Sequence, residues 1–363
     1  MSGRRRSRSA AAAELGAALK GCDPLGRDAD VLAALVSGEA VAAATLSMVI
    51  GDALVDDLVT TGVLTPGPGS VRLERALGFA HGLIYVRPDG AGADDAEVVY
   101  LGPDSAFLTE AVVRVAPSGR RAADLGAGTG LHAAVLSRCY DVVVATELLS
   151  RAARTARLTL ELNGIDSSGV VVADVGTALR PRSFDLVTAN PPWVPRAATE
   201  EAPVRVFADG GCTGTELPAL FMRQAAGLLA PDGVAVVLAL DVTCDDGRRP
   251  LRAACEELGG SDFVTWVVRS RLAATVPFLE AKMRERQPLI VAANHVAVII
   301  GAPSAADPGR VQLSKAVHAL AGAWGTEAQR VYVRRPRATG TGVPAVVGTP
   351  PSARSTKSRT RSS

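Results

Sequence analysis

The sequence predicts an α/β protein built on a doubly wound, mostly parallel sheet of seven strands, preceded by a small helical module with a β-hairpin. Two observations lead to this fold class. Over residues 122–300, short apolar segments alternate with segments whose apolar residues recur at helical spacing. The early apolar segments show almost no polar alternation, which is typical of parallel strands covered by helices on both faces. The expected architecture is therefore Rossmann-like, with ligands at the carboxyl ends of the strands.

The first hundred residues predict a compact module of their own. From residue 11 to about residue 64 the apolar residues recur at helical spacing, which predicts about three short helices that end at a Pro- and Gly-rich turn, 65–69. Residues typical of strands, at 71–87 and 97–101, lie on either side of a turn at 88–95 and predict a β-hairpin. We expect this module to pack against the main domain or to recognise a substrate.

The main domain follows as a regular alternation of elements. The expected strands are 122–125, 142–147, 170–174, 185–190, 234–240, 263–269 and 296–300. The expected helices are 131–139, 151–163, 216–229, 248–258 and 272–286, and residues 310–334 add a helix with room for an edge strand. The domain boundaries that follow are a disordered basic tail 1–10, the module 11–100, the main domain 101–335 and a disordered basic tail 336–363.

The charge distribution separates the tails from the body. The chain has 363 residues and a net charge of +2, but four arginines before residue 10 and eight basic residues from Arg330 onward leave a net charge of −10 on residues 11–329. An acidic body disfavours a broad phosphate-binding face, so any affinity for nucleic acid is expected to rest on the tails.

The cysteines and the apolar segments indicate which cellular compartment the protein occupies and whether it binds a metal. The five cysteines are scattered, with no Cys-x-x-Cys pair, and there are only four histidines, so neither a metal site nor a disulfide framework is expected. The sequence also lacks a signal-peptide pattern and an apolar run long enough to span a membrane. We expect a soluble, cytoplasmic protein.

The segment Ala123-Asp124-Leu125-Gly126-Ala127-Gly128-Thr129-Gly130 predicts a cofactor site. It runs from a buried strand through a glycine turn into a helix, and Gly126, Gly128 and Gly130 would let a ligand lie against the backbone. Glu147 ends the next strand about 20 residues later, where an acidic side chain accepts hydrogen bonds from ribose hydroxyls.

Three features favour S-adenosylmethionine over a dinucleotide. Leu131 occupies the position of the third glycine of a dinucleotide fingerprint. Asp124 would repel a pyrophosphate but suits the cationic methionyl end of S-adenosylmethionine. Asp174, at the end of the third strand, is placed to accept from the adenine amino group, although capping a helix or pairing with an arginine is the competing interpretation.

The segment Asn190-Pro191-Pro192-Trp193 ends the fourth strand and predicts the transfer site. The prolines supply carbonyls but no N–H groups, so the segment presents acceptors, namely the Asn190 side-chain oxygen and the Pro191 carbonyl. Two such acceptors can hold both hydrogens of an NH₂ group and aim its nitrogen at a methyl donor. Trp193 either stacks on a planar substrate or belongs to the core. His132 follows the glycine turn and could approach the cofactor, although a position on the helix surface or in the core is the competing interpretation. The other three histidines are assigned no role.

The segment from about Leu101 to Val242 resembles the class I S-adenosylmethionine-dependent methyltransferases. Within them it is most similar to the methyltransferase small domain group, which includes the release-factor glutamine methyltransferases. The matching pieces are the glycine turn, Glu147, Asn190-Pro191-Pro192-Trp193 and the later segment 207–214 with its Gly-Gly-x-x-Gly pattern. Trp193 stands where the glutamine methyltransferases have tyrosine, and the resemblance covers less than half of the chain.

The leading hypothesis is a methyltransferase that modifies an amide or amine nitrogen of a protein side chain or a small metabolite. The combination of motifs is shared with nucleic-acid enzymes, so an RNA or DNA base N-methyltransferase, acting on adenine N6 or guanine N2, is the first alternative. A non-catalytic interaction module would not need Asn190 and Glu147. An oxidoreductase comes last because of the glycine spacing and Asp124.

Overall fold

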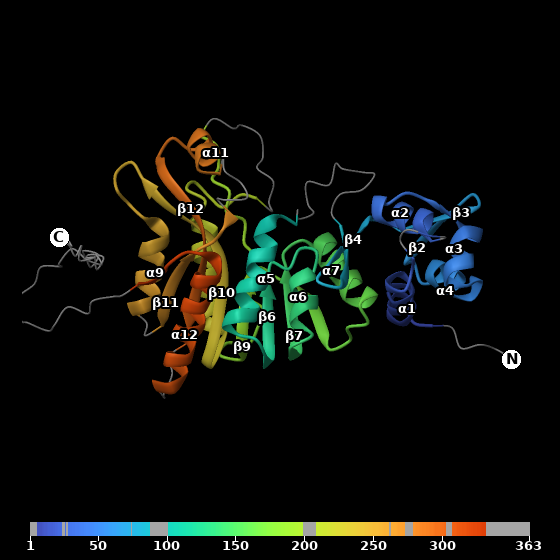
Figure 1. Cartoon of the computed structure of the whole chain (residues 1–363), viewed down its shortest axis with the longest axis horizontal. Helices are drawn as coiled ribbons and strands as arrows, with labels where there is room; N and C mark the ends of the chain where they lie inside the picture. Colours follow the sequence, from blue (N-terminus) through green and yellow to red (C-terminus); the bar gives the residue numbers. More distant parts are fainter. Residues whose placement is uncertain are drawn as a thin grey trace, which may run out of the picture.

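Eight strands form the central sheet in a computed structural model of the chain (Figure 1). The structure describes residues 6–23, 26, 28–73, 75–87, 101–198, 208–260, 263–272, 279–302 and 307–331. In the order in which they lie side by side, the strands are β13 (Ala328–Val331), β11 (Val264–Arg269), β12 (Ile290–Gly301), β10 (Leu229–Cys244), β9 (Phe184–Ala189), β6 (Gly119–Leu125), β7 (Tyr140–Glu147) and β8 (Ser168–Val172).

The strand directions confirm the predicted fold class. Strands β10, β9, β6, β7 and β8 pair in parallel, whereas β12 is antiparallel to both β10 and β11, and β13 is antiparallel to β11. Six strands therefore run in one direction and two in the other. The eighth strand is β13, which lies at the edge of the sheet and within residues 310–334, where the sequence left room for an edge strand beside the seven predicted strands.

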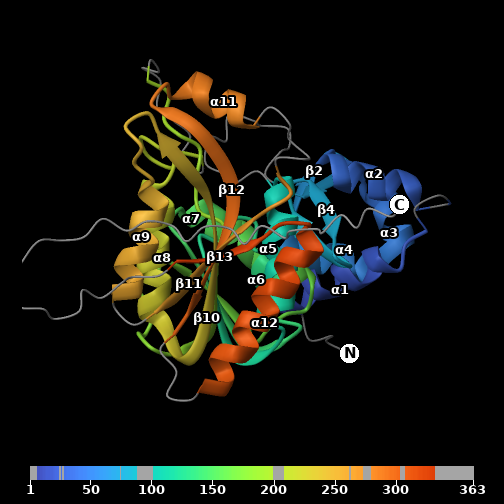
Figure 2. The same cartoon turned by 60° about the vertical axis from the view of Figure 1, so that its left-hand side comes forward.

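Helices cover both faces of this sheet (Figure 2). One face carries α5 (Pro103–Val115), α6 (Leu131–Leu136), α7 (Ser150–Leu162) and α12 (Asp307–Trp324), which bury their apolar side chains in one core cluster with the strands. The other face carries α8 (Glu216–Leu228) and α9 (Pro250–Gly260) over a second cluster. Helix α11 (Leu279–Arg286) packs beside β12. The central strands are thus buried on both sides, as their apolar sequences require.

Helix α5 is an element that the sequence analysis missed. Its buried residues Leu108, Ala111, Val112 and Val115 do recur at helical spacing, and Pro103 occupies the first turn, where its missing N–H costs nothing. These signals were present in the sequence. The helix is important because it brings Asp104 to the carboxyl ends of the strands.

The N-terminal module contains four helices, α1 (Arg8–Lys20), α2 (Ala29–Ser37), α3 (Ala43–Ile50) and α4 (Asp52–Thr60), where about three were predicted. They enclose a small antiparallel sheet of β1 (Val41–Ala42), β3 (Ser70–Leu73) and β2 (Leu64–Gly67). The predicted turn 65–69 lies within the β2–β3 hairpin and not at the end of the structured module. Helix α1 begins at Arg8, inside the segment expected as a disordered tail, because the Ser7 hydroxyl caps it by accepting from the Ala10 N–H.

A second hairpin, β4 (Leu77–Ala80) and β5 (Leu83–Val86), links the module to the main domain. Residues 71–87, expected as the first strand of a hairpin, instead contain β3, β4 and β5, of which β3 pairs with β2 and β4 pairs with β5. The expected turn 88–95, nearly all of the expected second strand 97–101 and the tail 336–363 lie outside the described residues. Among the described residues, no helix has the length and apolar character needed to cross a membrane. All five cysteines are free thiols.

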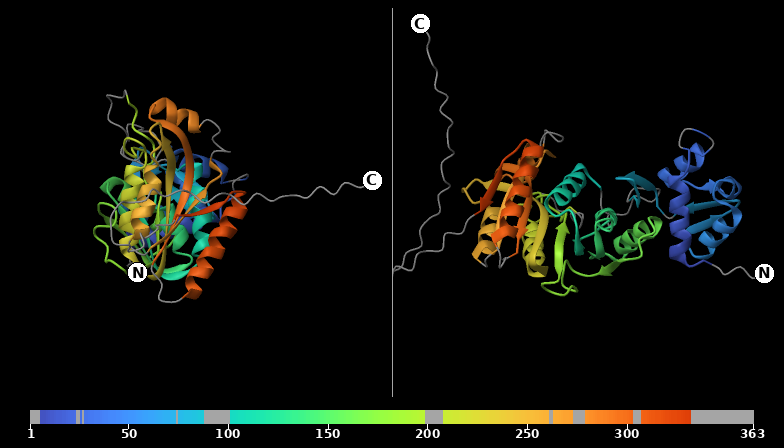
Figure 3. Two further views of the ribbon diagram at one scale, coloured as in Figure 1. Left: turned by 90° about the vertical axis from the view of Figure 1, so that its left-hand side faces the viewer. Right: turned by 60° about the horizontal axis from the view of Figure 1, so that its bottom comes forward.

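The module is fixed to helix α7 (Figure 3). The core of the module includes Leu158 and Leu162 of α7, and Gly16 of α1 lies so close to Leu162 that any Cβ on it would overlap the Leu162 carbonyl oxygen. The Asn163 side chain both donates to the Ile84 carbonyl (2.6 Å) and accepts from the Ile84 N–H (3.1 Å), which ties strand β5 to the end of α7.

Candidate active site

The glycine turn leaves the carboxyl end of β6, in the middle of the parallel part of the sheet. Gly126, Gly128 and Gly130 all have positive φ angles, of 69°, 53° and 77°. At Gly130 a side chain is excluded by space as well, because a Cβ there would lie 2.8 Å from the Cα of Ala156 in α7. The turn therefore needs glycine for its conformation and for its close packing against a helix.

Glu147 shapes this turn directly. It ends β7, is 7% exposed, and accepts hydrogen bonds from the Gly128 N–H (2.9 Å) and the Leu149 N–H (3.1 Å). From the sequence, Glu147 is expected to accept hydrogen bonds from ribose hydroxyls. In the structure it also stabilises the glycine turn through its bond from Gly128. A carboxylate has about four lone-pair positions, so these two bonds leave acceptor capacity for hydroxyls.

Asp124 is a buried carboxyl group, and one of its oxygens accepts no hydrogen bond from the described residues. It is 1% exposed, and its Oδ1 accepts from the Thr188 hydroxyl (3.0 Å). Burial raises the pKa of the Asp124 carboxyl, and this outweighs His132, Thr188 and the Ala133 N–H, which lower it. Its Oδ2 has no hydrogen-bond partner in the described part of the chain. A cationic group placed beside Oδ2 would satisfy this buried oxygen, as the ammonium group of a methionyl moiety could.

Asp174 lies at the same edge of the sheet as Glu147. It is exposed and follows β8, and the N–H of the preceding Ala173 donates to the Glu147 carbonyl (3.0 Å). Two apolar side chains that sequence reasoning missed flank this edge, because Leu148 is 52% exposed and Val172 is 55% exposed. Leu148 directly follows Glu147 and Val172 is the last residue of β8, so exposed apolar side chains lie next to both acidic residues and provide a surface on which an aromatic base could lie.

Asn190 is held by Asp104, a partner that sequence reasoning did not find. Asn190 follows β9, whose last residue Ala189 pairs with Leu125, so it is a neighbour of the glycine turn. Its Nδ2 donates to Asp104 Oδ2 at 2.7 Å, whereas its Oδ1 is buried and has no partner among the described residues. A carboxylate only accepts hydrogen bonds, so Asp104 fixes the orientation of the Asn190 amide and turns the oxygen away from itself.

Trp193 packs against the core beside the site. Its ring lies 5.2 Å from the ring of His295, edge to face at 64°, and contacts an apolar cluster that includes Leu240 and Val242. Pro191 is buried and Pro192 is half-buried. Of the two interpretations of Trp193, these contacts favour the core one.

His295 is a buried neighbour of the site. Its Nδ1 lies 2.7 Å from the Ser270 hydroxyl, and its Nε2 has no partner among the described residues. Burial lowers the pKa of His295 to about 4, although the nearby Asp104 opposes this shift. The ring is therefore neutral at physiological pH. His132, in contrast, has its Nε2 3.0 Å from the Ser105 carbonyl and is a satisfied structural residue.

The backbone of the glycine-rich segment 208–214 is hydrogen-bonded to Val194, the residue that follows the Asn190–Trp193 segment. The Val194 N–H donates to the Ala208 carbonyl, and the Gly210 N–H donates back to the Val194 carbonyl, both at 2.9 Å. A Cβ on Gly210 would lie 2.7 Å from the Trp193 Cα. Glycine is needed here because the two backbones touch. Phe207, also part of the quoted resemblance, lies outside the described residues.

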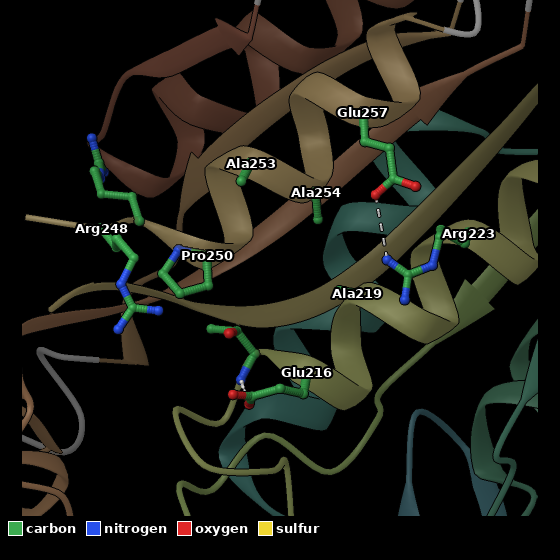
Figure 4. Close-up of a pocket in the computed structure, with 10 residues that line it drawn as sticks. Glu216, Ala219, Arg223, Arg248, Pro250, Ala253, Ala254 and Glu257 are labelled. Carbon is green, nitrogen blue, oxygen red and sulfur yellow. Dashed lines mark hydrogen bonds and ion pairs between the residues drawn. The ribbon is translucent and has the colours of Figure 1, made fainter.

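A cleft of about 520 Å³ opens between α8 and α9 (Figure 4). Its charged side chains are largely paired, since Arg223 meets Glu257 at 3.6 Å and Arg248 forms an ion pair with Asp246. The cleft lies on the face of the sheet opposite to α5 and Asp104. We assign the chemistry to the edge where Asp124, Glu147 and Asn190 converge.

Residues 101–240 match the family model described as methyltransferase small domain. This segment, which makes up less than half of the chain, is similar to that family. The resemblance predicted from the sequence is confirmed for it, and S-adenosylmethionine is the cofactor that this family assignment supports. The domain contains the glycine turn, the two strand-end acids and Asn190. Its residues fit the cofactor, because Asp124 offers an unsatisfied buried oxygen to a cationic group.

The chain spans about half the length of the curated relatives it matches. A release factor glutamine methyltransferase of Rhodospirillum rubrum is 29% identical over 197 residues, covering 52% of this chain and 58% of that protein. A tRNA1(Val) (adenine(37)-N6)-methyltransferase of Aeromonas hydrophila is 29% identical over 148 residues, covering 38% of this chain and 61% of that protein. An rRNA methylase from Streptococcus thermophilus of known structure aligns with a TM-score of 0.34 and 13% identity, over 57% of this chain and 100% of that one.

Proposed function

We propose that the chain is an S-adenosylmethionine-dependent N-methyltransferase that acts on an amide or amine nitrogen of a protein side chain or a small metabolite. One observation carries the specification of nitrogen. The Asn190 amide is anchored through its NH₂ group by Asp104, and this leaves its buried Oδ1 without a partner among the described residues. A buried acceptor oxygen of this kind is satisfied by an N–H donor, such as a substrate NH₂ group.

Different residues of the chain bind the cofactor and the substrate. Asp124 and Glu147 hold the cofactor through its cationic and hydroxyl groups, and the glycine turn gives it access to the backbone. When bound, S-adenosylmethionine supplies an electrophilic methyl group. Asn190 Oδ1 and the Pro191 carbonyl accept the two hydrogens of the substrate NH₂ group and so fix the direction in which its nitrogen attacks.

We assign no general base to this reaction. An amide or amine nitrogen can lose its proton to water after the methyl has been transferred. His295 lies close to Asn190's partner Asp104, but it is fully buried and neutral. Its contacts with Ser270 and Trp193 give it a packing role beside the substrate-binding residues.

The protein-directed form of this proposal is supported by relatives named as release factor glutamine methyltransferases. A second candidate function is N-methylation of an RNA base, which is favoured by the Aeromonas hydrophila relative that acts on a tRNA adenine. Both functions require the same acceptor pair, because a side-chain amide and an exocyclic base amine each present an NH₂ group. The five free thiols suit the cytoplasmic location that we propose.

The test is a substitution series at Asn190. Labelled S-adenosylmethionine is incubated with the protein and a cell extract, with and without nuclease, to find the acceptor class. On that acceptor, Asn190→Ala is expected to lower turnover by roughly 10²–10³, the usual effect of losing one preorganised polar contact in the transition state. Asn190→Asp keeps an acceptor oxygen and is expected to fall between the wild type and the alanine variant.

The control is cofactor affinity, measured by calorimetry with S-adenosylhomocysteine. All three proteins are expected to bind it equally, because Asn190 contacts the substrate. Turnover at the wild-type rate by the alanine variant would contradict the proposed role of Asn190, and acceptor activity that disappears on nuclease treatment would transfer the proposal to RNA.

A further inference from the structure

Four arginines line one pocket at the edge of the sheet opposite to the candidate active site. Arg120 and Arg121 lie at the start of β6, and Arg180 and Arg182 precede β9, so all four lie where these parallel strands begin. The pocket has a volume of about 430 Å³, which is within the usual size range of ligand sites. We call this feature the arginine pocket.

The arginine pocket has an excess of unpaired positive charge. In the described part of the chain, none of the four guanidinium groups forms an ion pair or a side-chain hydrogen bond. Among the described residues that line the pocket, the one acid is Asp185, whose Oδ2 accepts from the backbone N–H groups of Arg120 (2.8 Å) and Arg121 (3.0 Å). Four cations therefore face one carboxylate, on a body whose overall charge is negative.

The loop that carries two of these arginines has a strained backbone and is hydrogen-bonded to helix α8. Arg182 has a φ of 52°, in the left-handed region that non-glycine residues rarely adopt. The Arg182 N–H donates to the Gly227 carbonyl (3.1 Å), and the Ser183 N–H donates to the Leu228 carbonyl (2.8 Å), so the end of α8 holds the loop in this shape. Such a conformation costs of order 1–3 kcal/mol and persists where the surrounding structure imposes it, often at functional sites.

We propose that the arginine pocket binds phosphate groups, supplied either by a free oligophosphate or by the backbone of a nucleic acid. Guanidinium groups match phosphate in charge and in hydrogen-bond geometry. Strand β6 has seven residues, so the pocket lies roughly 20 Å from the glycine turn at its other end. The pocket is therefore a second site, distinct from the one that we assign to methyl transfer, and its existence does not depend on the proposed function.

The arginine pocket would place phosphate binding on the folded body. From charge alone, any nucleic-acid affinity is expected in the basic tails, because the body is acidic overall. A local cluster of unpaired arginines can still bind phosphate on an acidic body, since charges farther than about 10 Å away are screened at moderate salt.

The test uses the full chain and two probes, inorganic tripolyphosphate and a short single-stranded RNA. The variant Arg180→Ala/Arg182→Ala removes two charges from the arginine pocket, and Arg223→Ala/Arg248→Ala removes two charges from the α8–α9 cleft as a matched control. Affinity for each probe is measured by calorimetry or fluorescence anisotropy over a range of salt concentrations. The tails are present in every protein, so their contribution is common to all.

We expect the affinity of the pocket variant to fall at least about tenfold. The salt dependence of its RNA binding should become shallower by about one unit for each phosphate that the pocket no longer neutralises. The control variant should bind as the wild type does. Weakening only for tripolyphosphate identifies a free phosphate ligand, and weakening for both probes identifies a nucleic-acid backbone.

Equal weakening in both variants, or no binding of either probe, would overturn the proposal. Affinity for S-adenosylhomocysteine should stay unchanged in both variants, because the arginine pocket and the glycine turn lie at opposite ends of β6. This measurement separates the test of the arginine pocket from that of the proposed function.

Discussion

Asp104 shows how a single residue outside the recognised motifs can determine what a motif residue does. An asparagine side chain can present either its oxygen or its NH₂ group to a ligand. The 2.7 Å bond from Asn190 Nδ2 to Asp104 removes this ambiguity, because the carboxylate takes the NH₂ side. Asp104 is thus a positioning residue, which we expect to act through Asn190 and not through contact with the substrate.

We predict that Asp104→Ala lowers turnover by about 10- to 100-fold, since Asn190 can then rotate and its oxygen is correctly placed only part of the time. Asp104→Asn retains an acceptor oxygen and should keep more of the activity. Single-turnover kinetics at saturating cofactor measure the effect, and calorimetry with S-adenosylhomocysteine serves as the control. If the alanine variant instead bound the cofactor poorly and kept its turnover, Asp104 would belong to the cofactor site.

At the scale of elements, the contact between α1 and α7 decides how the N-terminal module is attached. Gly16 of α1 has no space for a side chain, because Leu162 of α7 lies directly against it. Helical glycines are normally destabilising relative to alanine by about 1 kcal/mol, so a glycine in this position indicates close packing. Arg8 and Glu161 add an ion pair across the same interface, at 3.4 Å.

We predict opposite effects for alanine at two helical glycines. Gly16→Ala should destabilise the protein by about 1–3 kcal/mol or more, since the added methyl overlaps the backbone of α7. Gly322→Ala, in α12, has no described atom within 4 Å of the added Cβ and should stabilise by up to about 1 kcal/mol. Urea unfolding followed by circular dichroism compares the two variants. A stabilising Gly16→Ala would mean that the module does not pack on α7 in solution.

At the scale of the whole molecule, the buried His295 and Asp124 make the free energy of unfolding depend on pH in opposite directions. Burial lowers the pKa of His295 to about 4, below its unfolded value of about 6.5. Between these two values the unfolded chain binds a proton that the folded chain does not, so stability is lost as pH falls. Burial raises the pKa of Asp124, so its contribution is lost as pH rises.

We therefore predict that His295→Gln makes stability less sensitive to acid than in the wild type. Between pH 7 and about pH 4 the wild type should lose up to about 3 kcal/mol through His295 alone, and this loss should be absent from the variant. The comparison cancels the contribution of Asp124, which both proteins share. Urea unfolding over this pH range measures the slopes, and parallel slopes would show that His295 is accessible to protons in the folded protein.

Much of the fold followed from local patterns. Parallel strands can be recognised from the sequence, because a strand covered on both faces is almost entirely apolar. The glycine turn can also be recognised, because a turn with positive φ angles favours glycine. Helix α5 was missed although its apolar spacing and Pro103 were visible. The edge strand β13 was expected only as an option within residues 310–334, because a four-residue edge strand has almost no periodicity to detect.

The sequence by itself determined which residues stand at the ends of the strands, since Glu147 and Asn190 follow directly from where each apolar segment stops. Only the tertiary structure decided what these residues touch. The bond between Asp104 and Asn190 spans 86 positions of sequence, and the arginine pocket joins residues about 60 positions apart. Contacts of this kind depend on which strands become neighbours and on which face a helix packs. The burial of the whole core determines both, and the local spacing of residues in the sequence does not predict either of them.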